Sequence, residues 1–287
     1  LISCQETKGA RFRDWRLVSL DGSTLDLADT RVNADEFGRP GASRGRSGFP
    51  QLRFVSLVEN GTHVLFGAEM GSYATAETTL ARRTLGRLES GMLCLADRNY
   101  FSYDCWKEAR KTGADLLWRV KKNLRLPCLE RLADGSYLSR IYASDKDRRH
   151  DHRPLEVRVV EYRLEGVPDS ESRYRLITTI LAAERAPAEE LAALYPERWE
   201  IETAFDELKT HLRGRRIVLR SKKPDLVRQE FYGLLLAHYA VRALMHEAAL
   251  RDDVDPDELS FTHSVRVVRR KLPLFVSIPP SGEGATS

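Results

Sequence analysis

The pattern of hydrophobic positions in the first half of the chain alternates between strand-length and helix-length segments. Apolar and β-branched runs of strand length occur at 16–20, 52–58, 63–70, 92–96 and 114–120. Segments with apolar residues at helical spacing occur at 75–88 and 102–112. The Asn60-Gly61 dipeptide predicts a hairpin, whereas Asp21-Gly22 predicts a turn that ends the first strand. We therefore expect three antiparallel strands, then a helix, a strand, a second helix and a further strand.

The second half begins with short alternating runs and ends in helices. The runs at 137–142 and 155–164 are broken by charged turns and predict a β-rich insertion. A buried strand is expected at 175–181, and helices at 188–194, 196–213, 225–250 and 257–271. The longest apolar stretch, 231–245, is too short to span a bilayer and contains His238 and Arg242. We expect it to be a buried helix, and we expect no association with a membrane.

This order of elements predicts an α/β fold with a ribonuclease-H-like mixed sheet flanked by helices. A β-rich insertion precedes the last helix of the site. We expect a first part of the core at 1–120, the insertion at 121–174, and a second part with C-terminal helices at 175–272. The Gly-, Ser- and Pro-containing segment 273–287 is expected to be a flexible tail.

Composition and charge narrow the class of protein. The 287 residues are 42% hydrophobic and 31% charged, which is typical of a folded chain. The net charge of +4 is mild, but basic residues are clustered. The clusters are Arg39, Arg44 and Arg46; Lys121, Lys122 and Arg125; Lys146 to Arg153; Arg213 to Lys223; and Arg266 to Lys271. The four cysteines have no paired spacing, which disfavours a zinc knuckle and fits a reducing cytoplasm.

Two aspartates and one helix carry the candidate chemistry. Asp21 and Asp97 each follow an apolar run, and carboxylates at the ends of adjacent strands share one crevice. The alternative for each is a turn former or a helix cap. In the helix after Pro196, a period of about 100° per residue places Arg198, Glu202 and Lys209 on one face. The alternative there is an ordinary surface ion pair between Arg198 and Glu202.

Three segments of the chain resemble the insertion sequence 4 family of DDE transposases. The spacing of Tyr195, Arg198, Glu202 and Lys209 is similar to the signature of that family. Asp21 in LVSLDGSTLDLADT and Asp97 in CLADRNYFS resemble its first and second catalytic segments, and the resemblance covers nearly the whole chain. Family members carry a further N-terminal region, whereas twenty residues precede Asp21 here. We therefore expect a catalytic domain from which that region is missing.

The resemblance implies a function and a set of site residues. Asp21, Asp97 and Glu202 would be the catalytic, metal-binding triad for Mg²⁺, with Mn²⁺ as a substitute and two ions in the site. Tyr195, Arg198 and Lys209 would contact DNA. The partners would be double-stranded DNA, as transposon inverted-repeat ends and as target, and a second copy in a homodimer on DNA. The activity would be DNA cleavage and strand transfer, in the cytoplasm and associated with the nucleoid. Trp118 or Tyr137 would stack a flipped base.

Two alternatives stay open beside this interpretation. One is a metal-dependent nuclease of the same fold that cuts DNA without joining it. The other is a non-catalytic, DNA-binding remnant of a transposase. A small-molecule enzyme is disfavoured because the sequence has no phosphate-binding Gly-rich loop, no dinucleotide fingerprint and no nucleophile elbow.

Overall fold

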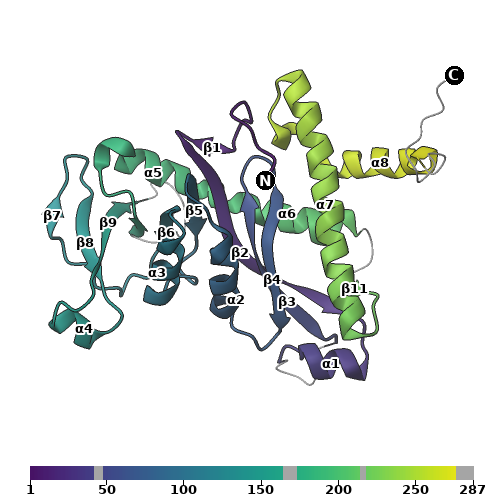
Figure 1. The fold of residues 1–287 in the computed structure, drawn as a ribbon, viewed down its shortest axis with the longest axis horizontal. Helices are drawn as coiled ribbons and strands as arrows, with labels where there is room; N and C mark the ends of the chain where they lie inside the picture. Colours follow the sequence, from purple (N-terminus) through teal and green to yellow (C-terminus); the bar gives the residue numbers. More distant parts are fainter. Residues whose placement is uncertain (42–47, 164–172, 214–217, 276–287) are drawn as a thin grey trace.

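The computed structural model describes residues 1–41, 48–163, 173–213 and 218–275. Its strands form one sheet in the order β4-β3-β2-β5-β6-β10-β9-β8-β7, with β1 and β11 also paired to β2 (Figure 1). The strands are β1 (Arg11–Phe12), β2 (Trp15–Leu27), β3 (Gln51–Glu59), β4 (Val64–Ser72), β5 (Met92–Ala96), β6 (Asp115–Arg119), β7 (Glu130–Arg131), β8 (Tyr137–Ile141), β9 (Leu155–Tyr162), β10 (Tyr174–Thr178) and β11 (Val218–Leu219).

The central strands have the predicted order. β2, β3 and β4 are antiparallel neighbours, and β5 and β6 continue the sheet parallel to β2. Helices α2 (Glu77–Thr84) and α3 (Tyr103–Lys111) make the connections between β4, β5 and β6. The hairpin predicted at Asn60-Gly61 joins β3 to β4, where Gly61 has a φ of 75°. The three antiparallel strands and the order of the two that follow are therefore present as predicted, and the structure shows that these two are parallel to β2.

The strands of the predicted insertion extend the same sheet. β10 is antiparallel to β6, and β9, β8 and β7 follow it toward the far edge (left in Figure 1). Arg158 on β9 is fully buried and fixes this end of the sheet. It donates to the Asp134 carboxylate, to Ser136 Oγ at 2.8 Å and to the Ala186 carbonyl at 2.7 Å. The division of the chain at 121 and 174 remains a prediction.

Helices cover both faces of the sheet. One face packs on α2 and α3 through an apolar cluster that includes Val18 and Leu20 of β2. On the other face, Leu25 and Leu27 of β2 pack against α6 (Glu200–Asp206) and α7 (Pro224–Asp252). The same side carries α5 (Ala188–Leu194) over β5 and β6. Apart from the two short helical segments that flank α6, the remaining helices are α1 (Arg31–Phe37), α4 (Asp145–Arg149), α8 (Phe261–Phe275) and the short η1 (Leu85–Arg87), η2 (Ala183–Arg185) and η5 (Pro256–Glu258).

The turn predicted at Asp21-Gly22 is wrong, because β2 continues through it to Leu27. Asp21 pairs with Ser56 and Gly22 with Val55 of β3. A Cβ on Gly22 would lie 2.9 Å from the Tyr100 hydroxyl and 3.1 Å from the Phe54 carbonyl. Glycine is thus required here by close packing within a strand, and not by the geometry of a turn.

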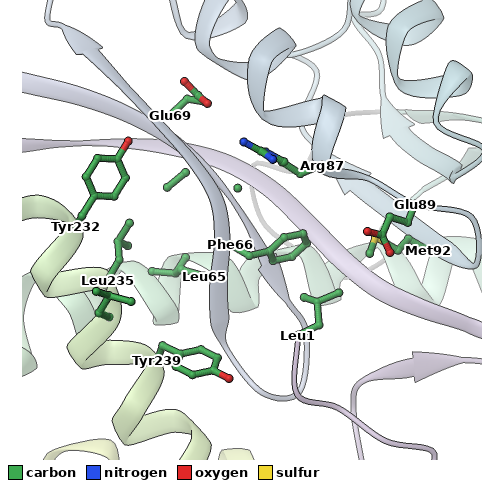
Figure 2. Close-up of a pocket in the computed structure, with 13 residues that line it drawn as sticks. Leu1, Leu65, Phe66, Glu69, Arg87, Glu89, Met92, Tyr232, Leu235 and Tyr239 are labelled. Atoms are coloured by element: carbon green, nitrogen blue, oxygen red, sulfur yellow. The ribbon is translucent and has the colours of Figure 1, made fainter.

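The prediction that 231–245 is a buried helix is also wrong in part. This segment belongs to α7, a 29-residue helix that buries Phe231 and Met245 but leaves Leu236 70% exposed. Tyr232, Leu235 and Tyr239 of α7 face β4 across a groove of about 680 Å³ (Figure 2). The apolar stripe of α7 packs against the core along only part of its width, so the continuous hydrophobic run in the sequence includes exposed residues as well as buried ones. Within the described ranges, no helix has the length and apolar character needed to cross a membrane.

Candidate active site

The sheet places Asp21 and Asp97 side by side. β2 and β5 are parallel neighbours, and Leu20 lies opposite Ala96 in their register. Asp21 is the next residue of β2 and Asp97 directly follows the end of β5, and neighbouring strands in an ordinary sheet are about 4.8 Å apart. Both side chains are partly exposed. The pairing of strands that are distant in sequence therefore brings the two predicted carboxylates to one place.

Glu202 lies on α6, in a helical segment of changing pitch. A 3₁₀ turn, η3 (Tyr195–Trp199), precedes α6, and a π-helical turn, η4 (Glu207–Leu212), follows it. The predicted helix 196–213 is therefore continuous but not regular, and its predicted end at Gly214 lies outside the described residues. Insertion of a π turn changes which residues share a face, and such turns are frequent at functional sites.

Apolar residues of this segment fix its position on the sheet. Ile201, Ala204 and Leu208 are fully buried against β2 and β3. Phe205 packs edge-on against Phe54 of β3, with ring centroids 5.2 Å apart. Glu202 is exposed and lies near enough to Asp21 of β2 for the charge of Asp21 to act on it. Phe205, which lies between Glu202 and Lys209 in the sequence, thus belongs to the core, whereas Glu202 does not.

The two predicted cations of this helix contact β2. Arg198 Nη1 lies 3.3 Å from Asp21 Oδ2, although Arg198 is only 5% exposed. Lys209 Nζ donates to Ser23 Oγ at 2.9 Å, two residues after Asp21 on the same face of the strand. The ion pair of Arg198 is therefore with the strand, and it is not the surface pair with Glu202 that the spacing alone allowed.

Tyr195 has a buried position beside Asp97. Its side chain is 6% exposed, and its hydroxyl donates to the carbonyl of Ala96 at 3.3 Å. Burial raises the pKa of Tyr195, and the negative charge of Asp97 contributes in the same direction. This contact joins the start of the helix to the end of β5.

Burial and like charge act on the carboxylates. Burial raises the pKa of Asp21, and the Gly22 N–H, Arg198 and the Tyr100 hydroxyl only partly oppose it. Burial also raises the pKa of Glu202, where Arg198 lowers it and the charge of Asp21 raises it further. The charge of Asp21 therefore makes ionisation of Glu202 more costly, and the charge of Glu77 has the same effect on Asp21. An oxygen-rich site with this charge is suited to a divalent metal ion.

Two residues of the site were not predicted from the sequence. The Tyr100 hydroxyl donates to Asp21 Oδ1 at 3.1 Å and to Glu77 Oε2 at 3.4 Å, while the ring is buried. Glu77 stands in the first turn of α2 and adds a further carboxylate near Asp21. The only signal for Tyr100 was its position three residues after Asp97, and nothing in the spacing indicated Glu77.

Two basic hollows are formed by residues that are distant in sequence. Arg125 lies with Arg148 and Arg149 of α4 around a hollow of about 520 Å³, where Asp145 supplies a partial counter-charge. Arg213, Arg220 and Arg269 line another of about 340 Å³ together with Glu230. Each hollow joins two of the basic clusters noted in the sequence. Arg44, Arg46, Arg215 and Arg216 lie outside the described residues.

One aromatic candidate for base stacking is excluded by its burial. Trp118 is fully buried and packs edge-on against Trp106, with centroids 5.3 Å apart. A base cannot reach it without unfolding the core. Tyr137 is half-buried and donates to Glu161 at 3.1 Å. Near the site, the indole of Trp199 is instead 56% exposed, beside the guanidinium of Arg198.

These features define a ribonuclease-H-like domain with a carboxylate site at the junction of β2, β5 and α6. The sequence matches the family described as the transposase DDE domain over residues 14–240, and the chain belongs to this family. The predicted family resemblance is thereby confirmed.

Known relatives and a solved structure agree with this assignment. The chain is 30% identical over 259 residues to transposase InsG of insertion sequence element IS4 from Escherichia coli strain K12. The match covers 89% of this chain and 58% of InsG, so the chain spans little more than half the length of that relative. The fold resembles that of piggyBac transposase in a cryo-EM synaptic complex with hairpin DNA, with a TM-score of 0.54 and 10% identity. That match covers 92% of this chain and 54% of the other, and it confirms the predicted fold class.

Proposed function

We propose that this chain is the catalytic domain of an insertion-sequence transposase that cleaves DNA and joins the freed end to new DNA. The observation that carries the proposal is the register of β2 and β5, which sets Asp21 beside Asp97, with Glu202 of α6 near enough for the charge of Asp21 to raise its pKa. The contact of Arg198 with Asp21 supports it, because a buried guanidinium beside the triad can also bind a phosphate oxygen.

Asp21, Asp97 and Glu202 would hold Mg²⁺, or Mn²⁺ in its place, as two ions. Their oxygen donors and the raised pKa values of Asp21 and Glu202 fit such a group, since a divalent cation offsets the repulsion that burial intensifies. When bound, the metal supplies charge neutralisation at the scissile phosphate and lowers the pKa of the attacking oxygen. Tyr100 and the Gly22 N–H hold the Asp21 carboxylate in place for this role.

The reaction has two steps in one site. Water attacks the phosphorus at the transposon end, and the bond to the 3′ oxygen breaks to give a 3′-hydroxyl and a 5′-phosphate. That hydroxyl then attacks a phosphorus of the target DNA, loses its proton to solvent, and displaces the target's own 3′ oxygen. Arg198 and Lys209 would bind phosphates beside the reacting group. For Tyr195, the hydroxyl bond to Ala96 favours bracing of the helix over direct contact with DNA.

DNA would extend from the site over the basic hollows. Arg125, Arg148 and Arg149 on one side, and Arg213, Arg220 and Arg269 on the other, supply donors for its backbone. The partners would be inverted-repeat ends, target DNA and a second copy of the chain on paired ends. Because bacterial chromosomal DNA is the substrate, the site of action would be the nucleoid in the cytoplasm.

A joining assay tests this proposal against its two alternatives. The purified chain is incubated with labelled inverted-repeat DNA, an unlabelled target plasmid and Mn²⁺, and the products are separated on a denaturing gel. Labelled strands joined to the plasmid, absent with Glu202→Gln, are the expected result. Cleavage without joined products would identify a nuclease, and metal-independent binding without cleavage would identify a remnant. Glu197→Gln, an exposed change of the same kind on η3, is the matched control.

A further inference from the structure

A second cluster of metal-binding residues lies behind the catalytic helix. His63 follows the β3–β4 turn, Glu200 begins α6, and Asp257 lies in η5 between α7 and α8. One ligand atom from each lies within 4.8 Å of the others. None of the three belongs to the proposed triad, although Glu200 precedes Glu202 by two residues. Three elements that are far apart in sequence thus meet at one point.

The geometry of His63 points to a cation at this place. His63 is 3% exposed, and its Nε2 atom has no partner that meets hydrogen-bond geometry. Asp257 Oδ1 nevertheless lies 3.2 Å from this nitrogen and Glu200 Oε2 lies 3.6 Å from it. Ligands of a tetrahedral ion, each at about 2.0–2.2 Å from it, are separated from one another by roughly 3.3–3.5 Å. The Glu200 and Asp257 oxygens lie at such distances from His63 Nε2 but outside hydrogen-bond geometry, as expected for three ligands of one metal ion.

The other ring nitrogen of His63 lies beside a carboxylate, as in many metal-binding histidines. His63 Nδ1 lies 3.3 Å from Glu207 Oε1, which can accept its proton. Glu207 is fixed in turn by Arg242 Nε at 2.9 Å and His238 Nε2 at 3.0 Å, and Arg242 Nη2, which can only donate, also lies against His63 Nδ1. A carboxylate on the far side of a ligating imidazole sets its tautomer and leaves Nε2 free for the metal. Metal binding at His63 therefore requires that Glu207, and not a donation from Arg242, sets the proton on Nδ1.

Access and charge agree with a bound divalent ion. The Asp257 side chain is 36% exposed, so an ion can enter from solvent and keep water as a fourth ligand. The carboxylates of Glu200, Asp257 and Glu207 exceed the single guanidinium of Arg242 by two charges, and a divalent ion would balance them. One nitrogen and two oxygen ligands in a small site are typical of Zn²⁺, whereas Mg²⁺ prefers oxygen ligands alone.

We infer that His63, Glu200 and Asp257 form a structural Zn²⁺ site that ties the β3–β4 turn and η5 to the start of the catalytic helix. This site is separate from the triad. It does not depend on the proposed DNA chemistry, because its test measures metal binding by the protein itself.

The test is a Zn²⁺ titration of the chelator-stripped chain in excess Mg²⁺, with calorimetry for stoichiometry. One tight equivalent is expected in the wild type and in Asp97→Asn. Asp257→Asn, at an exposed position, should weaken Zn²⁺ binding at least about tenfold. Loss of a residue that only contacts a metal ligand already lowers metal affinity by about that factor, and loss of a ligand should cost no less. His63→Gln should abolish Zn²⁺ binding. Glu258→Gln, in the same turn and outside the cluster, is the matched control and should bind as the wild type does.

Two further measurements, of Co²⁺ absorption and of Tm, test the Zn²⁺ site even if one of the variants is unstable. Co²⁺ in place of Zn²⁺ should give the strong visible bands of a four-coordinate ion, and Asp257→Asn should lose them. Zn²⁺ should raise the Tm of the wild type and of Glu258→Gln but not that of Asp257→Asn. Absence of a tight equivalent in the wild type, or equal binding by wild type and Asp257→Asn, would overturn the inference and identify a protonated His63 in an ion-pair network.

Discussion

Tyr100→Phe removes a single hydroxyl from the candidate active site and leaves the ring in place. That hydroxyl joins Asp21 to Glu77 at 3.1 and 3.4 Å, and the ring is 1% exposed. Phenylalanine has the same shape, so no cavity is expected. Without the hydroxyl, the Asp21 carboxylate loses a donor and faces the charge of Glu77 directly.

The magnitude follows from the type of bond that is lost. A hydrogen bond to a charged group contributes about 1.5–3 kcal/mol. The hydrogen bond lowers the pKa of Asp21, so its loss should raise that pKa further. Loss of an outer partner of a metal ligand typically costs about 10- to 100-fold in metal affinity or activity. We therefore expect the variant to need about 10- to 100-fold more Mn²⁺ for half-maximal cleavage.

The assay is nicking of inverted-repeat DNA as a function of Mn²⁺ concentration, with urea unfolding measured beside it. Tyr103→Phe is the control, because its hydroxyl donates to the Arg153 carbonyl at 2.8 Å, away from the triad. The two variants should have similar stability, and only Tyr100→Phe should shift the metal requirement. An unchanged Mn²⁺ midpoint for a folded Tyr100→Phe would refute the assignment of Tyr100 as the residue that positions Asp21.

Three further predictions concern stability. Arg158→Ala should lower the free energy of unfolding by about 3–5 kcal/mol in urea melts, because it leaves Asp134 without its buried partner; an effect below about 1 kcal/mol would contradict this. Burial raises the pKa of Glu207, but hydrogen bonds from His238 and His63 outweigh burial and lower the pKa overall. The ionised Glu207 carboxylate therefore stabilises the folded protein above the unfolded pKa of about 4.3, and this stabilisation is lost as pH falls toward the lowered folded pKa. Glu207→Gln should therefore be less stable than wild type at about pH 6, and the gap should narrow by about pH 3.5; a constant gap would show that the charge is not responsible. Gly61→Ala should cost at least about 2 kcal/mol, since φ is 75° and its Cβ would lie 2.6 Å from backbone atoms; a neutral result would mean that the hairpin turn adjusts freely.

The order of strands and helices could be predicted where the pattern of apolar residues in a segment matches the burial of that segment in the fold. The apolar run at 92–96 is β5 with the predicted bounds, and its two buried faces explain why it lacks alternation. The Asp-Gly pair at 21–22 misled, because packing against Tyr100 requires glycine there as strongly as a turn would. Helix α1, with Thr30 as its cap, was missed because its seven residues are too few to show a period.

The candidate site was predictable only where its residues share a segment or a strand end. Asp97 and the spacing of Arg198, Glu202 and Lys209 can be read along the chain. The ion pair of Arg198 with Asp21 and the bond from Lys209 to Ser23 join residues far apart in sequence, and the π turn at Glu207–Leu212 has no local signature. Pairings of that kind depend on strand order, which a single sequence does not specify residue by residue.

The most direct test of the central claim is metal-dependent nicking at the repeat boundary by wild type and by Asp97→Asn. The substitution keeps the shape of a half-exposed side chain and removes its charge, so folding should be unaffected. If the metal stabilises the transition state by about 3 kcal/mol or more, nicking should fall at least about 100-fold in Mn²⁺. Equal nicking by the two proteins would contradict the assignment of Asp97 to the metal site and, with it, the catalytic role proposed for the junction of β2, β5 and α6.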